Sequence, residues 1–215
     1  MDVDQIAALR LLLAPTGWLE RTSYFGRALA RTARTPQGLL IVGTPQDEPW
    51  HLTAHLADEA RLAQLPGLVP QLVRWAPPPG SPAHLSIGIS RLETVAREET
   101  LLVVSAAAAP AALLERLADA RKTGATLFAL DHGDPELDAL AHESLAVPPG
   151  TAPLSFDAAQ HLVSAAAGEP DGRRGGPRTG RGGELAAGAG QARGVHGLRS
   201  RLARLLDAVS GTPVD

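Results

Sequence analysis

The chain has no cysteine, one lysine and very few aromatic residues. The absence of cysteine among 215 residues excludes disulfide bonds, thiolate catalysis and cysteine-based zinc ribbons. Lys122 is the single lysine, and aromatic residues make up 3% of the chain. The heavy use of Arg, Ala, Gly and Pro is typical of a GC-rich genome, so the scarcity of lysine indicates codon bias rather than a function.

A long hydrophobic run is also missing. The longest nearly apolar stretch, 101–114, contains Ser105 and Pro110 and falls short of the roughly 20 residues that a membrane-spanning helix needs. The opening "MDVDQIAALR" is acidic and amphipathic, unlike the basic and then apolar start of a secretory signal. We therefore expect a cytoplasmic protein with no membrane partner.

Positive charge is scarce in most of the chain and is concentrated near its end. Residues 1–167 hold 12 basic and 18 acidic side chains, whereas residues 168–215 hold 8 arginines and 5 acids. An acidic body lacks the basic face that nucleic acid requires. The run "GRRGGPRTGRGG" has no Phe or Tyr to stack on bases, so we interpret it as a solvated linker and expect no nucleic-acid partner.

Short apolar runs alternate with helical patterns along the chain. Strands are predicted at 38–44, 68–76, 100–105, 125–131 and 144–148, and helices at 3–14, 19–34, 49–65, 91–99, 111–124, 135–143 and 155–168. This alternation predicts an α/β fold: a three-layer α/β/α sandwich with a mainly parallel, five-stranded sheet. Pro70 in the second run fits an edge strand or the start of a strand.

Four segments are predicted. N-terminal helices occupy 1–37 and the α/β domain occupies 38–167. Residues 168–197 have almost no large apolar side chain, which predicts a disordered linker rich in Gly and Arg. Residues 198–215 place leucines on one stripe and arginines on the other, which predicts an amphipathic helix that docks on protein, either the body or a partner, rather than on a membrane.

The succession "LLIVGT" and then "ETLLVVSAAAAPAALLERLADARKTGATLFALDHGDPELDALAHESLAVP" resembles the sugar isomerase (SIS) domain family. The resemblance covers about residues 38–165 and is clearest over 98–148. It implies a parallel α/β sandwich that binds phosphosugars and assembles as a homodimer or higher oligomer. The family's phosphate loop reads S-x-S-G-x-T, and here "SAAAAP" stands in its place.

Most of that loop's chemistry is lost. Ser105 matches the first serine, but Ala107, Ala108 and Pro110 stand where the second serine, the glycine and the threonine would be. Two hydroxyl donors are absent, and proline removes one backbone donor from the first turn of the helix. The remaining helix dipole contributes only about 0.3 to 1 kcal/mol at an exposed end. We therefore do not expect strong phosphate binding by this loop.

The resemblance implies further ligand-binding positions. Gly43 matches the first glycine of the family's G-x-G-x-S turn and Thr44 could donate a hydroxyl, while Pro45 replaces the second glycine. Backbone N–H groups near Ala108 would remain available to a ligand. Asp131 stands where the family often has threonine, and its carboxylate would repel a phosphate dianion.

Three groups of polar residues are candidates for chemistry. "DHGDPELD" places Asp131 and His132 at the carboxyl end of a strand, and its Asp134 is explained as a helix N-cap. His161, on the last predicted helix, is the second candidate, because the SIS resemblance implies that a histidine or glutamate from a neighbouring segment or subunit can act as the base. His51 and His55 lie one turn apart on a helix, with Asp58 and Glu59 one turn further on, and could hold a divalent metal. No glutamate stands between the two histidines, where Leu52 and Thr53 lie instead, so a packing or solvated role is the favoured interpretation.

Two functions remain open. The first is a non-catalytic SIS-like protein that senses a sugar derivative or acts as an oligomeric interaction module. The second is a phosphosugar isomerase or related lyase with a rearranged site, in which Thr44 and Ser105 bind the ligand and His132 or His161 is the base. We expect no metal and no cofactor in either case, and whether the chain is an enzyme is left open, with a non-enzyme favoured.

Overall fold

A computed structural model describes residues 13–152 and 154–169 of the chain. The helix predicted at 3–14, the linker at 168–197 and the helix at 198–215 lie almost entirely outside these residues. Residues 13–17, with the 3-10 helix η1 (Ala14–Thr16), belong to a separate unit, and the unit described below runs from Trp18 to Glu169. None of the helices in the described ranges is long and apolar enough to cross a membrane.

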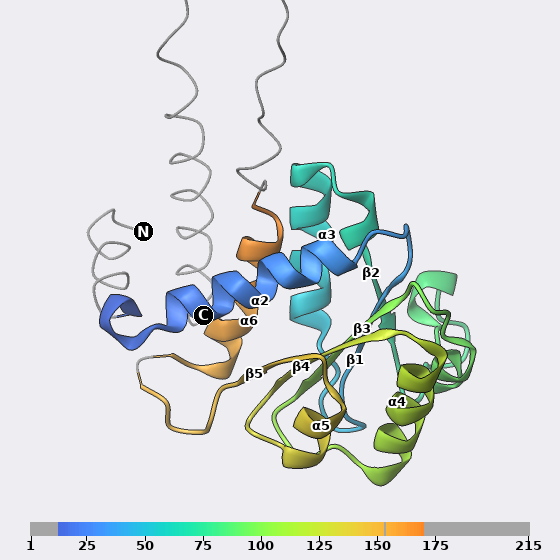
Figure 1. Cartoon of the computed structure of the whole chain (residues 1–215). Helices are drawn as coiled ribbons and strands as arrows, with labels where there is room; N and C mark the ends of the chain where they lie inside the picture. The colour runs from blue at the N-terminus through green and yellow to red at the C-terminus, as the bar shows by residue number, and fades with distance from the viewer. Residues whose placement is uncertain (1–12, 153, 170–215) are drawn as a thin grey trace, which may run out of the picture. The chain divides into compact units, whose positions relative to one another are not determined.

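The centre of this unit is a sheet of five parallel strands in the order β2-β1-β3-β4-β5 (Figure 1). The strands are β1 (Leu39–Val42), β2 (Pro70–Val73), β3 (Thr100–Ser105), β4 (Thr126–Asp131) and β5 (Glu143–Ala146). All residues of β1 and β3 are buried, as expected for continuous apolar runs covered on both faces. Pro70 opens the edge strand β2, where a missing backbone donor is tolerated.

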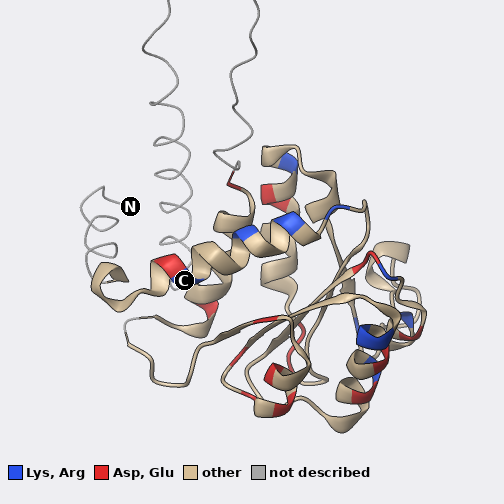
Figure 2. Ribbon diagram, in the orientation of Figure 1, with Lys and Arg blue, Asp and Glu red and all other residues tan. Residues whose placement is uncertain are grey.

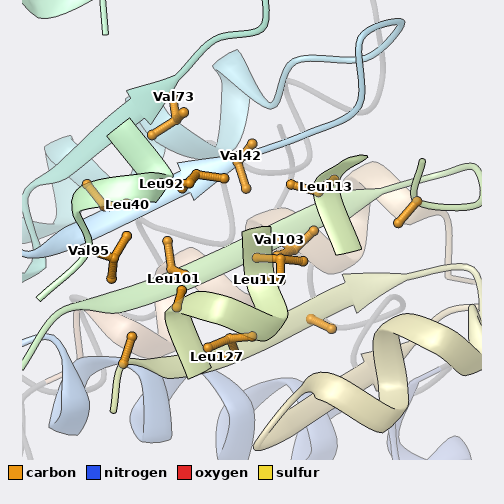
Figure 3. Packing of buried hydrophobic residues seen from close by; sticks show 14 of the residues in the cluster. Leu40, Val42, Val73, Leu92, Val95, Leu101, Val103, Leu113, Leu117 and Leu127 are labelled. Carbon is orange, nitrogen blue, oxygen red and sulfur yellow. The ribbon is translucent and has the colours of Figure 1, made fainter. Parts of the chain in front are cut away.

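Helices cover both faces, which confirms the predicted three-layer sandwich. On one face, Leu113 and Leu117 of α4 pack with Leu101 and Val103 of the sheet (Figure 3). On the other face, Phe25 of α2 meets Phe128 of β4 edge to face, with ring centroids 5.3 Å apart. The helices are α2 (Trp18–Thr32), α3 (Trp50–Ala63), α4 (Ala111–Thr123), α5 (Pro135–Leu140) and α6 (Phe156–Ala167).

The helix predicted at 91–99 is only partly formed. The structure has a 3-10 helix, η4 (Ile89–Thr94), and the chain then becomes extended at Val95. The Glu99 carboxylate accepts a hydrogen bond from Ala96 N at 2.7 Å and pairs with Arg91, which holds the segment in a turn before β3. Local hydrogen bonds by an acidic side chain therefore replace a second helical turn.

The strand order indicates the position at which sheets of this kind bind ligands. The chain leaves β1 for β2 on one side and then crosses to β3 on the other side, so β1 and β3 are neighbours whose connections run in opposite directions. Open parallel sheets of this order bind ligands at the carboxyl ends of the strands beside such a switch point. Thr44 and Ser105, which follow and end these two strands, lie at this point.

Candidate functional site

The turn after β1 folds back on itself at Gly43. A side chain here would lie 2.1 Å from Asp47 O and 2.7 Å from Pro49 Cδ, so only glycine permits the turn. Thr44 and Asp47 exchange two backbone hydrogen bonds, of 3.0 and 3.3 Å. Gly43 O also accepts a hydrogen bond from Trp75 Nε1 at 2.9 Å. The glycine therefore serves the closure of the turn rather than the close approach of a ligand.

Thr44 presents a buried hydroxyl at the switch point. The residue is 2% exposed, and among the described residues its Oγ1 has no hydrogen-bond partner. A buried hydroxyl without a partner costs about 1 to 3 kcal/mol. Among the predicted ligand-binding residues, Thr44 is therefore the one with a side-chain hydroxyl that can still form a hydrogen bond with a ligand.

Ser105, by contrast, has its hydroxyl satisfied within its own loop. Its Oγ donates to Ala107 O and accepts a hydrogen bond from Ala107 N at 3.3 Å, and the residue is fully buried. Ala108 is exposed at the tip of this loop. The predicted N–H donors near Ala108 are thus partly occupied, because Ala107 N already has an acceptor.

A carboxylate accepts a hydrogen bond from a second backbone N–H of the loop, that of Ala109. Asp134 Oδ2 accepts a hydrogen bond from Ala109 N at 2.7 Å, across 25 positions of sequence. Its other oxygen, Oδ1, caps α5 by accepting from Glu136 N at 2.9 Å and Leu137 N at 3.3 Å. The predicted N-cap role of Asp134 is confirmed, and the sequence missed its second role as the internal acceptor of the loop after β3.

Asp131 is turned toward its own backbone. It is 2% exposed and lies beside Ser105 in the register of β3 and β4. Its Oδ1 accepts from Gly133 N and, at 3.1 Å, from Asp134 N, in a turn where Gly133 has a φ of 99°. Burial raises the pKa of the Asp131 carboxyl above its usual value of 3.8; the Gly133 and Asp134 hydrogen bonds oppose that shift, and the charges of Asp134 and Asp138 add to it.

The raised pKa of Asp131 predicts how stability changes with pH. Because the folded pKa of Asp131 lies above the unfolded value, the folded chain favours the protonated carboxyl over the ionised carboxylate. The stability that the protonated carboxyl contributes is therefore lost as pH rises through the folded pKa. Asp131→Asn has no such loss, so the stability of the variant relative to the unmodified chain is expected to rise as the pH increases from about 4 through the folded pKa of Asp131. Urea unfolding at a series of pH values measures it.

The exposed Asp119 of α4, replaced by asparagine, is the matched control for this experiment, because its side chain is 75% exposed. Its stability relative to the unmodified chain should vary less with pH than that of Asp131→Asn, because an ion pair exposed to water contributes little. A difference between Asp131→Asn and the unmodified chain that is equally flat would contradict the argument.

The two candidate bases have different ring neighbours. His132 is half-buried at the carboxyl edge of the sheet, and its ring contacts Phe156 at a centroid distance of 4.6 Å. His161 contacts His55 of α3, with ring centroids 4.3 Å apart, and His51 lies at 6.4 Å. The structure therefore joins His161 to the histidine pair that the sequence had placed on another helix.

Burial and its histidine neighbours weaken the basicity of His161. The residue is 7% exposed. Burial, and then the charges of His55 and His51, lower its pKa from 6.5 to about 4, against an opposing effect from Asp157. His161 is therefore neutral at physiological pH in this structure.

Sequence reasoning also missed a polar cluster after β1 and β2. Glu48 Oε2 accepts hydrogen bonds from Arg74 Nε at 2.8 Å and from Trp50 Nε1 at 3.1 Å, and the Arg74 guanidinium lies 4.5 Å from the Trp50 ring centroid. Both charged side chains are 15% exposed. These contacts hold the turn after β1 in place. The Glu48 carboxylate also neutralises the charge of Arg74, which directly follows β2.

No known family model matches the chain, and no curated protein matches it significantly.

Proposed function

We propose that the chain is a non-catalytic, SIS-like cytoplasmic protein that acts by binding an uncharged sugar derivative, and that it has lost the phosphosugar chemistry of that family. The observation that carries the proposal is the hydrogen bond from Ala109 N to Asp134. A carboxylate of the chain accepts from the backbone donor that a phosphate oxygen would otherwise use at the start of a helix. The Asp134 carboxylate thus takes the place that the anion of a ligand would have.

The charge of the surrounding loops supports this proposal. The loops at 43–49, 105–110 and 131–134 contain four carboxylates and neither lysine nor arginine. In Figure 2 the acidic colour gathers around α5, which begins directly after Asp134. Arg74 neutralises Glu48, so the repulsion on a phosphate dianion would come from the other three carboxylates, Asp47, Asp131 and Asp134. The loops themselves contain no cation that would offset it. An uncharged ligand meets no such repulsion.

The free hydroxyl of Thr44 favours a polar but neutral ligand. A hydroxyl group of a sugar could donate to or accept from Thr44 Oγ1, and it would remove the cost of leaving that atom buried and unpaired. The position beside β1 and β3 is the one at which sheets of this order bind ligands. We assign Thr44 as the main polar contact of the ligand.

The alternative function, a phosphosugar isomerase or lyase, lacks support from the positions of its bases. A proton transfer between adjacent carbons needs a base within hydrogen-bond reach of the substrate. His161 lies among His51 and His55, and His132 packs on Phe156. The isomerase also needs phosphate donors, and Ala107 N and Ala109 N already have acceptors in the chain.

Thermal denaturation against two panels of ligands tests the proposal. Phosphosugars at millimolar concentration are expected to leave the Tm unchanged beyond the effect of inorganic phosphate, whereas at least one uncharged sugar or sugar derivative raises it by several degrees. Thr44→Val, which keeps the shape and removes the hydroxyl, should abolish that rise. Ser105→Ala is the matched control, since the Ser105 hydroxyl is satisfied within its loop.

Opposite outcomes are equally clear. A phosphosugar that raises the Tm by several degrees, with the effect lost in Ser105→Ala, would overturn the proposal. Turnover of a phosphosugar that is lost in His132→Ala would establish the isomerase alternative instead. A homodimer or higher oligomer, as the SIS resemblance implies, is expected in sedimentation analysis.

A further inference from the structure

Three histidines from two helices converge on one point of the surface. His51 and His55 lie one turn apart on α3, and His161 faces them from α6. One ring nitrogen from each residue lies within 4.8 Å of the corresponding nitrogens of the other two. Imidazole is a common ligand of zinc and related ions.

We propose that His51, His55 and His161 form a binding site for a divalent transition-metal ion, with Zn²⁺ as the ion that fits best. In a tetrahedral site with Zn–N bonds of about 2.1 Å, ligand nitrogens lie about 3.4 Å apart. The three nitrogens must approach one another by about 1.4 Å at most, which rotation of the exposed His51 ring can supply. Three imidazoles leave one position of a tetrahedral ion for water or another ligand.

The three residues differ in how deeply they are buried. His161 is buried, His55 is half-buried and His51 is exposed. The buried histidine is fixed by packing, while the exposed one leaves a path by which the ion can enter from solvent. A site on the surface of α3 and α6 also needs no opening of the core to load.

The helix that carries His161 also carries a carboxylate one turn earlier. Asp157 precedes His161 by four positions on α6, so the two side chains lie on the same side of that helix. Three neutral imidazoles leave the charge of a dication uncompensated, so this carboxylate favours binding. No lysine or arginine occurs between 154 and 168 to oppose it.

Packing alone explains the three histidines less well. The neighbouring positions of α3 that face the sheet are Leu52 and Leu56, both at most 1% exposed, and apolar side chains would equally serve the contact between α3 and α6. A metal held by residues 51, 55 and 161 joins two helices that are more than 100 positions apart in sequence. The ion would therefore stabilise the folded chain as well as provide an open coordination position.

Cobalt and zinc titrations of the full chain, prepared without a histidine tag, test the proposal. One equivalent of Co²⁺ is expected to give the visible absorption bands of a low-coordinate cobalt site, and Zn²⁺ to displace it and raise the Tm by several degrees. His51→Gln and His161→Gln should each weaken binding by more than the roughly 10- to 100-fold that loss of an outer-shell partner costs. The control, His132→Gln, should bind like the unmodified chain.

The variants are chosen so that a folding defect does not obscure the answer. His161 is buried, so the decisive variant is His51→Gln, whose side chain is exposed and whose loss should leave the metal-free Tm unchanged. Absence of stoichiometric Co²⁺ binding would overturn the proposal. Binding that survives in His51→Gln, or that is lost equally in His132→Gln, would overturn it as well, because it would place the ion elsewhere.

Discussion

Asp134→Ala is expected to lower the free energy of unfolding by about 2 to 4 kcal/mol, because it removes a helix cap and a charge-assisted hydrogen bond together. One carboxylate oxygen caps α5 through Glu136 N and Leu137 N, and the other accepts from Ala109 N in the loop after β3. Its loss frees both segments at once. Urea unfolding at neutral pH gives the change.

Two further variants separate these roles. Asp134→Asn keeps one oxygen for the cap, and asparagine caps helices about as well as aspartate. Its amide nitrogen cannot accept from Ala109 N, so the loss should fall to about 1 to 2 kcal/mol. Glu136→Ala, an exposed change on the same helix, should have little effect. A stability of Asp134→Ala within about 0.5 kcal/mol of the unmodified chain, a difference the size of ordinary surface effects, would refute the internal-anion argument.

The strands were predictable because their signal is local. Continuous apolar runs bounded by Gly, Pro or charged residues mark β1, β3 and β4, and the run 100–105 coincides with β3 (Thr100–Ser105). Parallel strands buried on both faces have few other interpretations. The fold class therefore follows from the sequence, without any knowledge of the ligand.

The ends of two helices were predicted less well, because hydrogen bonds outside the helical pattern decide them. The first is the helix predicted at 91–99, described above. The second is the helix predicted at 135–143, which ends at Leu140. His142 instead joins the sheet: its Nδ1 accepts from Leu127 N at 3.0 Å, and its backbone N donates to Leu127 O at 2.8 Å. A residue 15 positions away thus ends the helix, and no local pattern reveals it.

The candidate site shows the same limit more strongly. The spacing of His51 and His55 was visible in the sequence, but the third histidine lies on α6, and its proximity depends on both helices covering the same face of the sheet. The contact between Ala109 and Asp134 likewise depends on the neighbouring positions of β3 and β4. The sequence shows which residue types are present, and the topology decides which of them meet.

A close contact between α2 and α6 gives the second large prediction. A Cβ atom added to Gly26 would lie 2.5 Å from Val163 O, 2.8 Å from Ala166 Cβ and 2.9 Å from Ala167 N. Two of these three atoms belong to the backbone of α6, which cannot move aside as a flexible side chain can. Only glycine allows α2 to approach so closely, and α2 in turn brings Phe25 onto Phe128 of the sheet.

Gly26→Ala is therefore expected to destabilise the chain by about 1 to 3 kcal/mol, although alanine favours a helix over glycine by about 1 kcal/mol. The sign of the change in stability tests the close contact, because helix propensity alone predicts that alanine stabilises the chain. Gly88→Ala is the matched control: its φ is −86° and the nearest atom to the new methyl group is 4.0 Å away, so its stability should change little. Chemical denaturation compares the two. A Gly26→Ala chain as stable as the Gly88→Ala chain would mean that α2 does not pack on α6 as closely as described.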